Sequence, residues 1–130
     1  MPQLAKGGKW VFGWVLVGTD KQVVIPPAAF VEFGFQPGEA IIFTRGSRSS
    51  GGCGIGRRKV ISSNDVMPLR GFADGVMGES GRVVLPEALD VAPGERLLVV
   101  RGSRYALGLL KFGPIVEEAK KHLDLEVFTP

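Results

Sequence analysis

The sequence predicts a mainly β protein with short helices, built from two tandem repeats that form one pseudo-dimeric domain. Three observations support this fold class. Two segments of the chain, residues 21–48 and 81–104, have similar sequences. Glycine is abundant, with 19 residues in a chain of 130, which favours tight turns over long helices. Each repeat, roughly 40 residues long, offers more apolar sheet surface than so short a unit covers by itself.

The repeats align in two blocks separated by a gap. In the first block the offset is 60 residues, and the segment "VVIP" falls on "VVLP". A gap of four residues then lowers the offset to 56, and "PGE" and "RGSR" recur in the same order. Two proline-containing blocks and an identical tetrapeptide in one order indicate an internal duplication. The matched positions are 22–26 with 82–86, Ala28 with Ala88, 37–39 with 93–95, 45–48 with 101–104, and Gly52 with Gly108.

Each repeat opens with a strand, a polar turn and a second strand. The first strands are the apolar runs "WVLV" and "GVM", and the polar turns are "GTDKQ" and "GESGR". The second strands end at Pro26 and Pro86, because proline has no N–H to donate to a sheet and suits the first turn of a helix. We expect a short helix at 27–33 in the first repeat and about one turn at 86–89 in the second.

Each repeat closes with two further strands. The turns "QPGE" and "APGE" lead into continuous apolar strands at 40–44 and 96–100. The glycine-bearing "RGSR" turns are followed by the last strands, at 52–55 and 106–112. We expect the two units to bury their apolar faces against each other around an approximate two-fold axis.

The domain organisation follows from these elements. Residues 1–60 form the first repeat, with its core at 14–55, residues 61–74 are a linker, and residues 75–112 form the second repeat. Residues 113–130 are a helix and tail, since Pro114 suits the first helical position and Ile115, Val116, Ala119 and Leu123 make an apolar stripe. This helix is expected to pack on the repeats or on a second subunit.

Composition argues against an enzyme and against a bound metal or cofactor. The single cysteine, Cys53, and the single histidine, His122, provide no convincing metal-ligand or catalytic cluster. The run "GSRSSGGCGIGRRK" has Arg57 and Arg58 where a phosphate-binding Walker loop needs Lys followed by Ser or Thr. The neighbouring arginines leave open a lowered thiol pKa at Cys53, with an inert thiol as the alternative.

The N-terminal run "WVFGWVLVG" indicates a strand. At nine residues it is too short to span a bilayer, and no small-residue cleavage pattern follows it. We therefore expect no membrane association. A lone cysteine fits a reducing cytoplasm, which is the predicted location.

The order polar turn, "GRVVLP", short helix, "PGE" and apolar strand resembles the AbrB/MazE/SpoVT family of swapped-hairpin proteins. The match is closest at 79–95 and extends to 20–39, and it covers the repeats without the linker or the C-terminal helix. The resemblance implies that two units interlace their hairpins into one small barrel of the double-psi type. It also implies that the turns present basic residues to DNA. The MraZ branch of the family carries both units in one chain, as this sequence does.

Charge is distributed unevenly along the chain. Residues 1–60 hold eight Lys or Arg against three Asp or Glu, whereas residues 61–130 hold eight against ten. Between Ala40 and Val60 there are five basic residues and no acidic one, a distribution that attracts phosphate or stays a solvated loop. The predicted contacts to double-stranded DNA are Lys21 and Arg82 in the turns, together with Arg45, Arg48, Arg57, Arg58, Lys59, Arg101 and Arg104, and Lys6 and Lys9 add further charge.

Two functions are consistent with these features. The first is a DNA-binding transcriptional regulator, which uses the basic turns. The alternative is an antitoxin-like or other protein-interaction module, in which the C-terminal segment "IVEEAKKHLDLEVFTP" binds a protein partner or a second copy. The duplicated "RGSR" turns form a symmetric pair of anion-binding turns if both face one side of the two-fold axis, and otherwise they are solvated hairpin turns.

Overall fold

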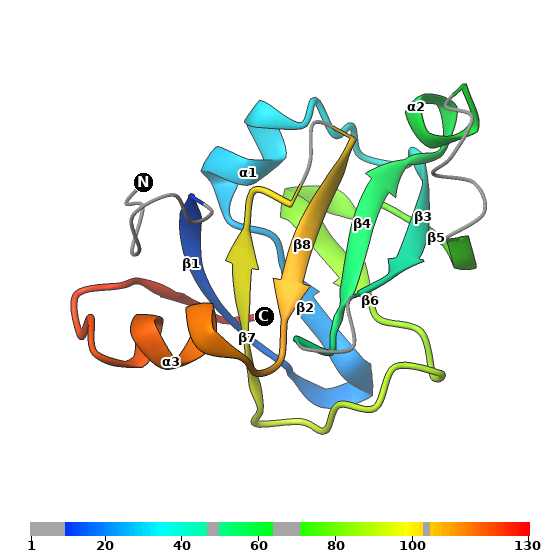
Figure 1. Cartoon of the computed structure of the whole chain (residues 1–130). Coiled ribbons are helices and arrows are strands. Elements are labelled where there is room, and N and C mark those ends of the chain that lie inside the picture. Colours follow the sequence, from blue (N-terminus) through cyan, green and yellow to red (C-terminus); the bar gives the residue numbers. More distant parts are fainter. Residues whose placement is uncertain (1–9, 47–49, 64–70, 103–104) are drawn as a thin grey trace.

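The computed structural model describes residues 10–46, 50–63, 71–102 and 105–130, whose strands form one large and one small sheet (Figure 1). The large sheet has the strand order β5-β3-β4-β8-β7-β1-β9, and the small sheet pairs β2 with β6. The strands are β1 Val11–Leu16, β2 Gln22–Val24, β3 Ala40–Arg45, β4 Cys53–Arg57, β5 Gly71–Val76, β6 Arg82–Val84, β7 Arg96–Val100, β8 Ala106–Leu110 and β9 Val127–Phe128. The helices are α1 Pro27–Glu32, α2 Arg58–Ser62 and α3 Pro114–Lys120, with single 3-10 turns η1 Thr19–Lys21 and η3 Glu79–Gly81.

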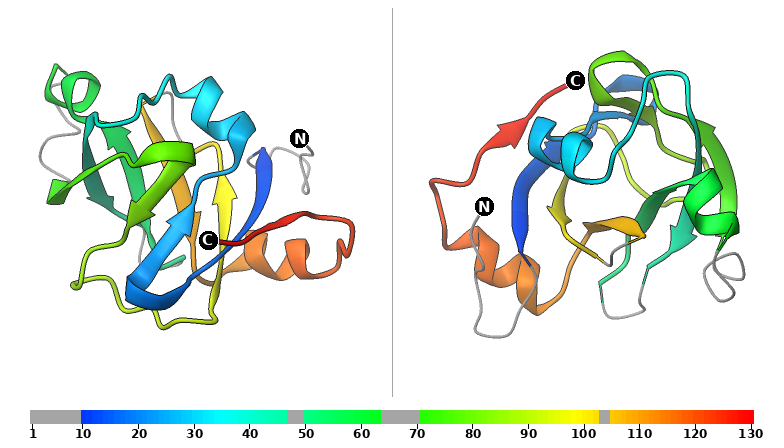
Figure 2. Two further views of the ribbon diagram at one scale, coloured as in Figure 1. Left: turned by 180° about the vertical axis from the view of Figure 1, so that it is seen from behind. Right: turned by 90° about the horizontal axis from the view of Figure 1, so that it is seen from above.

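The fold is mainly β with short helices, as predicted, but the large sheet does not close into a barrel. Its edges are β5 and β9, and every neighbouring pair is antiparallel except β1 with β9. The short strands β2 and β6 pair with each other and lie together at the back of the molecule (Figure 2). Pro26 and Pro86 follow these strands closely and cannot donate to a ladder, so neither strand extends to close the large sheet.

The first strand of each repeat pairs with the third strand of the other repeat. β1 lies antiparallel to β7, and β5 lies antiparallel to β3. The registers are equivalent: Leu16 faces Arg96 in one pair, and Val76 faces Ala40 in the other. Both pairs carry an irregularity at the same place, beside Phe12 and beside Phe72. The duplication in the sequence is therefore matched by a duplication of the strand pairings.

Two further pairs mark the approximate two-fold axis that relates the repeats. Val23 faces Val83 at the centre of the small sheet, and Gly54 faces Gly108 in the β4 and β8 pair. Equivalent residues of the two fourth strands are therefore 54 positions apart in the sequence. Gly108 corresponds to Gly54, and not to Gly52 as the sequence alignment indicates. The turn before β4 is longer than the turn before β8, which accounts for the difference from the predicted alignment.

The main core lies between the large sheet and the small sheet, and both repeats contribute to it. The mutual burial predicted from the sequence is confirmed, because one cluster of buried side chains draws on every strand except β5 and β9, and partly buried residues of those two strands pack against it. Each fully buried Val or Leu contributes about 1.5–3 kcal/mol relative to an exposed one. The cluster includes Val15, Val23, Ile25, Ile41 and Ile55 from the first repeat, and Val83, Leu85, Leu97, Val99 and Leu107 from the second.

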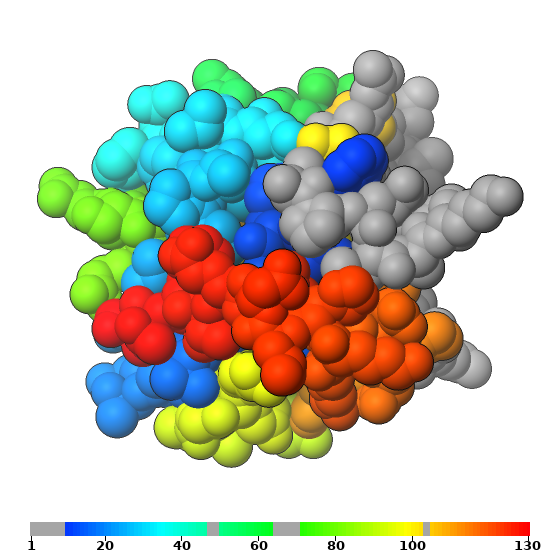
Figure 3. Space-filling model, turned by 90° about the vertical axis from the view of Figure 1, so that its left-hand side faces the viewer, coloured from blue at the N-terminus to red at the C-terminus, as the bar shows by residue number. Residues whose placement is uncertain are grey.

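The C-terminal segment packs on the outer face of the large sheet. Val116 and Ala119 of α3 join a second cluster with Trp14 and Leu98, and β9 adds a parallel strand beside β1. The orange and red C-terminal segment covers much of this side of the molecule (Figure 3). This cover explains why β7 is apolar on both faces, since its alternate residues point into the two clusters. The predicted helix begins at Pro114, but it ends at Lys120. Leu123 is 94% exposed and does not belong to the apolar stripe.

Both ends of the predicted linker 61–74 differ from the structure. The second repeat begins with β5 at Gly71, four residues before the predicted boundary, because the sequence pattern indicates an apolar run only after Asp74. The first residues of the predicted linker belong to α2. Residues 86–89 form about one turn, as expected, with a hydrogen bond from the Leu89 N–H to the Pro86 carbonyl.

Candidate nucleic-acid interface

The two polar turns, η1 and η3, have the same backbone geometry. Asp20 and Lys21 have φ of 58° and 56°, and their counterparts Ser80 and Gly81 have φ of 57° and 80°. Such left-handed conformations are unfavourable for residues other than glycine, and here they occur in the tight connections from β1 to β2 and from β5 to β6. Both turns also expose a carboxylate near a predicted cation, since Asp20 precedes Lys21 and Glu79 lies three residues before Arg82.

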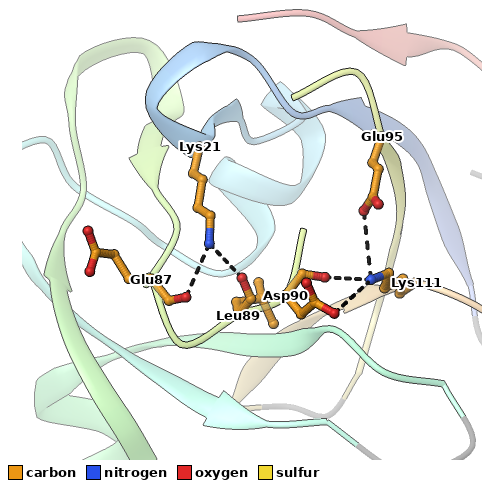
Figure 4. A network of polar contacts seen from close by, with 6 residues as sticks. All are labelled: Lys21, Glu87, Leu89, Asp90, Glu95 and Lys111. Atoms are coloured by element: carbon orange, nitrogen blue, oxygen red, sulfur yellow. Dashed lines mark hydrogen bonds and ion pairs between the residues drawn. The ribbon is translucent and has the colours of Figure 1, made fainter. Parts of the chain in front are cut away.

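Lys21, the basic residue of the first turn, is engaged within the fold. Its Nζ donates hydrogen bonds to the backbone carbonyl of Leu89 at 2.7 Å and of Glu87 at 3.2 Å (Figure 4). These carbonyls belong to the turn that replaces a helix in the second repeat. A hydrogen bond from a charged donor to a carbonyl oxygen is stronger than one between neutral groups. Lys21 therefore acts as a cap for the 86–90 turn.

Cationic residues at the ends of the two fourth strands pair with the glutamates of the "PGE" turns. Nε of Arg57 lies 2.6 Å from Oε1 of Glu39, and Nζ of Lys111 lies 3.9 Å from Oε2 of Glu95. Arg57 and Lys111 are equivalent at the offset of 54 residues, so the ion pair is duplicated with the repeat. Nζ of Lys111 also donates to the carbonyl oxygen of Asp90 at 2.5 Å (Figure 4). Arg57 is thus held by an acid and is withdrawn from the predicted interface.

Arg101 forms a two-point contact with a helix carboxylate. Its Nε and Nη2 lie 2.6 Å and 2.5 Å from the two oxygens of Glu32, the last residue of α1. The hydrogen bonds from Arg101 hold the pKa of the Glu32 carboxyl below its usual value, and the same bonds raise the pKa of Arg101. Arg45, the equivalent of Arg101 in the first repeat, is exposed and has no acidic partner among the described residues.

The remaining predicted contacts are exposed or lie outside the described residues. Arg82 is exposed on β6, and Lys59 is exposed on α2. Arg58 lies 3.7 Å from Asp74, with more than half of each side chain exposed, which is a weak surface contact. The predicted residues Arg48 and Arg104, and Lys6 and Lys9, lie outside the described part of the chain.

Of the two "RGSR" segments, only Arg45 and Gly46 and their counterparts Arg101 and Gly102 belong to the described residues. The fourth strands that follow the two segments, β4 and β8, are antiparallel neighbours, so these strands start at opposite ends of the sheet (Figure 1). The remaining residues of both segments lie outside the described part of the chain, and a shared pair of anion-binding turns stays a prediction.

Sequence reasoning missed the acidic partners of this surface. Glu39 forms an ion pair with Arg57, and Glu32 forms one with Arg101, so neither arginine is free to contact DNA. The contact of Glu39 could have been predicted from the sequence. The "PGE" turn is duplicated, and the antiparallel pairing of the third and fourth strands places its glutamate beside the end of the fourth strand. For Glu32 no such duplication exists, because the described residues of the second repeat form no counterpart of α1.

Cys53 is an inert thiol in this fold. It lies in β4 with 2% of its surface exposed, and burial raises the pKa of the thiol to about 12. The alternative of a lowered pKa is wrong, because the neighbouring arginine side chains do not offset the loss of water. Within the described ranges, we find no grouping of three His, Cys, Asp or Glu residues suited to a metal ion. No helix in that same part of the chain has the length and apolarity needed to span a membrane.

Comparison with known proteins leaves the family open. No family model matches the chain, and no curated protein matches it. Among solved structures, the chain is similar to the solution structure of PHS018 from Pyrococcus horikoshii, with 19% sequence identity and a TM-score of 0.38. That match covers 80% of this chain and 98% of the other. Similarity at this level carries no argument about function.

Proposed function

We propose that this chain is a DNA-binding transcriptional regulator of the AbrB-like class, with both units of the swapped-hairpin scaffold in one polypeptide. One observation carries the proposal: the first strand of each repeat pairs with the third strand of the other, in the same register. The resemblance of the "GRVVLP" and "PGE" segments implies this exchange of strands. The open large sheet departs from the closed barrel of that class.

The proposed contacts to DNA are fewer than the sequence alone indicated. Lys21, Arg57 and Arg101 are engaged with carbonyl or carboxylate oxygens, and each would lose those contacts before reaching a phosphate. Arg58, Lys59 and Arg82 remain as exposed cations whose side chains are not held by strong contacts. Arg45 is exposed as well, but it lines a separate hollow, so the other three are the proposed contacts. Phosphate contacts by such residues bring affinity without sequence selectivity.

The test is duplex DNA binding at two salt concentrations. With three phosphate contacts, a threefold rise in salt weakens binding about twentyfold, because log K falls by about 0.9 per contact per decade of salt. A genomic-fragment selection at both concentrations identifies bound sequences at the same time. Binding that is unchanged by the rise in salt would contradict the proposed contacts.

A matched pair of variants separates a contact from a structural cation. Arg82→Ala removes a proposed contact, and it should lower the slope of log K against log salt by about one. Lys21→Met removes the same formal charge from a residue that caps the 86–90 turn. It should lower stability by about 1–2 kcal/mol and leave the slope unchanged. Equal effects of both variants on the slope would show that the assignment of these two residues is wrong.

A further inference from the structure

The two repeats differ most where the first has α1 and the second has a short turn. The alignment loses four residues between Ala88 and Pro93 relative to Ala28 and Pro37. In the first repeat this length forms α1, which ends at Glu32 over the end of β7. By the two-fold relation, the equivalent place in the second repeat lies over the end of β3, where the described residues form no counterpart of α1.

The place without a helix is a hollow of about 490 Å³. Three of the lining residues, Arg45, Gly46 and Phe72, correspond to Arg101, Gly102 and Phe12, and Arg101 contacts the end of α1. Among the described lining residues, one is a cation and the rest are apolar. The lining residues are Arg45, Gly46, Gly52, Phe72, Ala88 and Leu89.

Arg45 is the one charged side chain among the described residues that line the hollow, and its partners differ from those of its counterpart Arg101. Arg101 holds both oxygens of Glu32, whereas Arg45 has no carboxylate partner among the described residues. The hollow thus combines an available guanidinium with an apolar floor that includes Phe72. In the other repeat, Arg101 receives the carboxylate at the end of α1, and Phe12, Phe30 and Phe33 all pack against the main core cluster.

We propose that the hollow at Arg45 binds an acidic helical segment of a partner protein, which takes the position that α1 takes over Arg101. The segment would carry one carboxylate at its C-terminal turn to pair with Arg45 in two-point geometry. It would also carry an apolar side chain close by in sequence to cover Phe72. The proposal stands on the comparison of the two repeats and does not depend on DNA binding.

The probe is a synthetic peptide with the sequence of residues 26–37 of this chain, "PPAAFVEFGFQP", which contains α1 and Glu32. Binding to the full chain is followed by amide chemical shifts. The expected result is saturable binding, with the largest shifts at Gly46, Gly52, Phe72 and Ala88. The Arg45→Ala chain and the Glu32→Gln peptide should each bind about tenfold more weakly, since each loses a charge-assisted contact.

Two controls distinguish the hollow from general attraction. Arg58→Ala removes an exposed arginine that does not line the hollow, and it should bind the peptide as the original chain does. A chain in which residues 89–92 are replaced by the sequence of residues 29–36 should form a second α1 over Arg45 and lose peptide binding. Because that variant fills the hollow, its gain in stability provides a readout that is independent of the peptide.

Several results would overturn the proposal. Equal weakening by Arg45→Ala and Arg58→Ala would show nonspecific charge attraction. Shifts confined to other surfaces would place the peptide elsewhere. Displacement of the peptide by duplex DNA, with the same set of shifts, would assign the hollow to DNA. Self-association that Arg45→Ala abolishes would assign it to a second copy of the chain. Restored binding between an Arg45→Glu chain and a Glu32→Lys peptide would support the proposal directly.

Discussion

Val23 and Val83 face each other at the centre of the β2 and β6 pair, although sixty residues separate them in the chain. Both side chains are almost completely buried, and each is the counterpart of the other under the offset that relates the repeats. A residue that pairs with its own counterpart lies on the two-fold axis. This pair therefore marks the point at which the duplicated sequence becomes a single core.

Truncation of either valine should have nearly the same effect. Val23→Ala and Val83→Ala each remove buried methyl groups from equivalent environments, and each should lower the free energy of unfolding by about 2 kcal/mol. Urea unfolding measures both values. Val84→Ala is the matched control, since Val84 is next to Val83 and 58% exposed, and its effect should stay within about 0.5 kcal/mol. A large difference between the two buried sites would contradict the symmetry.

The duplicated ion pairs should contribute unequally. Glu39→Gln breaks a contact of 2.6 Å between side chains that are at most 20% exposed, and it should lower stability by about 1–2 kcal/mol. Glu95→Gln removes a charge that lies 3.9 Å from Lys111 and whose buried Oε2 accepts no hydrogen bond, so its effect should be below about 0.5 kcal/mol. Chemical denaturation compares them. A larger loss from Glu95→Gln would reverse the assignment of the stronger pair.

Cys53 should remain unreactive in the folded protein and should make stability fall at alkaline pH. Burial raises the pKa of its thiol from 9.0 to about 12, so the unfolded chain loses this proton before the folded one. Between these values, the free energy of unfolding decreases by about 1.4 kcal/mol for each unit of pH. From about pH 8 to about pH 10.5 the contribution of this group amounts to a loss of about 2 kcal/mol.

The comparison with Cys53→Ala isolates this effect from other groups that titrate at alkaline pH. The variant should lack this part of the decrease, whereas an identical pH dependence in both proteins would show that the thiol ionises in the folded state. Alkylation of the native protein should proceed only through unfolding, because the thiol has 2% of its surface exposed.

Gly13 should determine whether β9 docks. Its φ is +138°, and a Cβ at this position would lie 2.7 Å from the carbonyl oxygen of Glu126. Gly13→Ala should therefore displace β9 and break the hydrogen bond from the Trp14 N–H to Glu126, which spans 2.9 Å. Amide exchange at Trp14 and Phe128 measures the change.

Gly38→Ala is the control for backbone strain without crowding. Gly38 has a φ of +81°, and a Cβ there would meet no atom within 4 Å. This variant should lose about 1 kcal/mol of stability and keep β9 in place. If the amides of β9 exchange equally slowly in both variants, the close approach at Gly13 does not control the strand.

The sequence predicts the order of elements within each repeat well, for physical reasons that act locally. Pro26 and Pro86 end strands wherever they occur, and the "PGE" turns set the start of β3 and β7. Pro114 likewise predicts the start of α3. The partners of the strands are harder to predict from residues alone, because β3 and β7 are both apolar and either one suits β1. The exchange between repeats was expected only from the family resemblance.

The set of available cations was the weakest part of the sequence-based prediction. Lys21 finds its carbonyl partners 66 and 68 residues away, and Arg101 finds Glu32 at a separation of 69. The number of charged residues in each part of the chain does not reveal which residues so far apart in the sequence contact each other. The short strand β9 was missed for a similar reason, because two residues provide no periodic pattern and pair only with the distant β1.

The central claim is that neither repeat completes its sheet without a strand from the other. The most direct test inserts a protease site between Ser63 and Gly71, cleaves the folded protein there, and measures the mass of the product under native conditions. The account predicts that the two pieces remain together at the mass of the intact chain, since β1 pairs with β7 and β3 with β5. Separation into two pieces that are each folded monomers would contradict it.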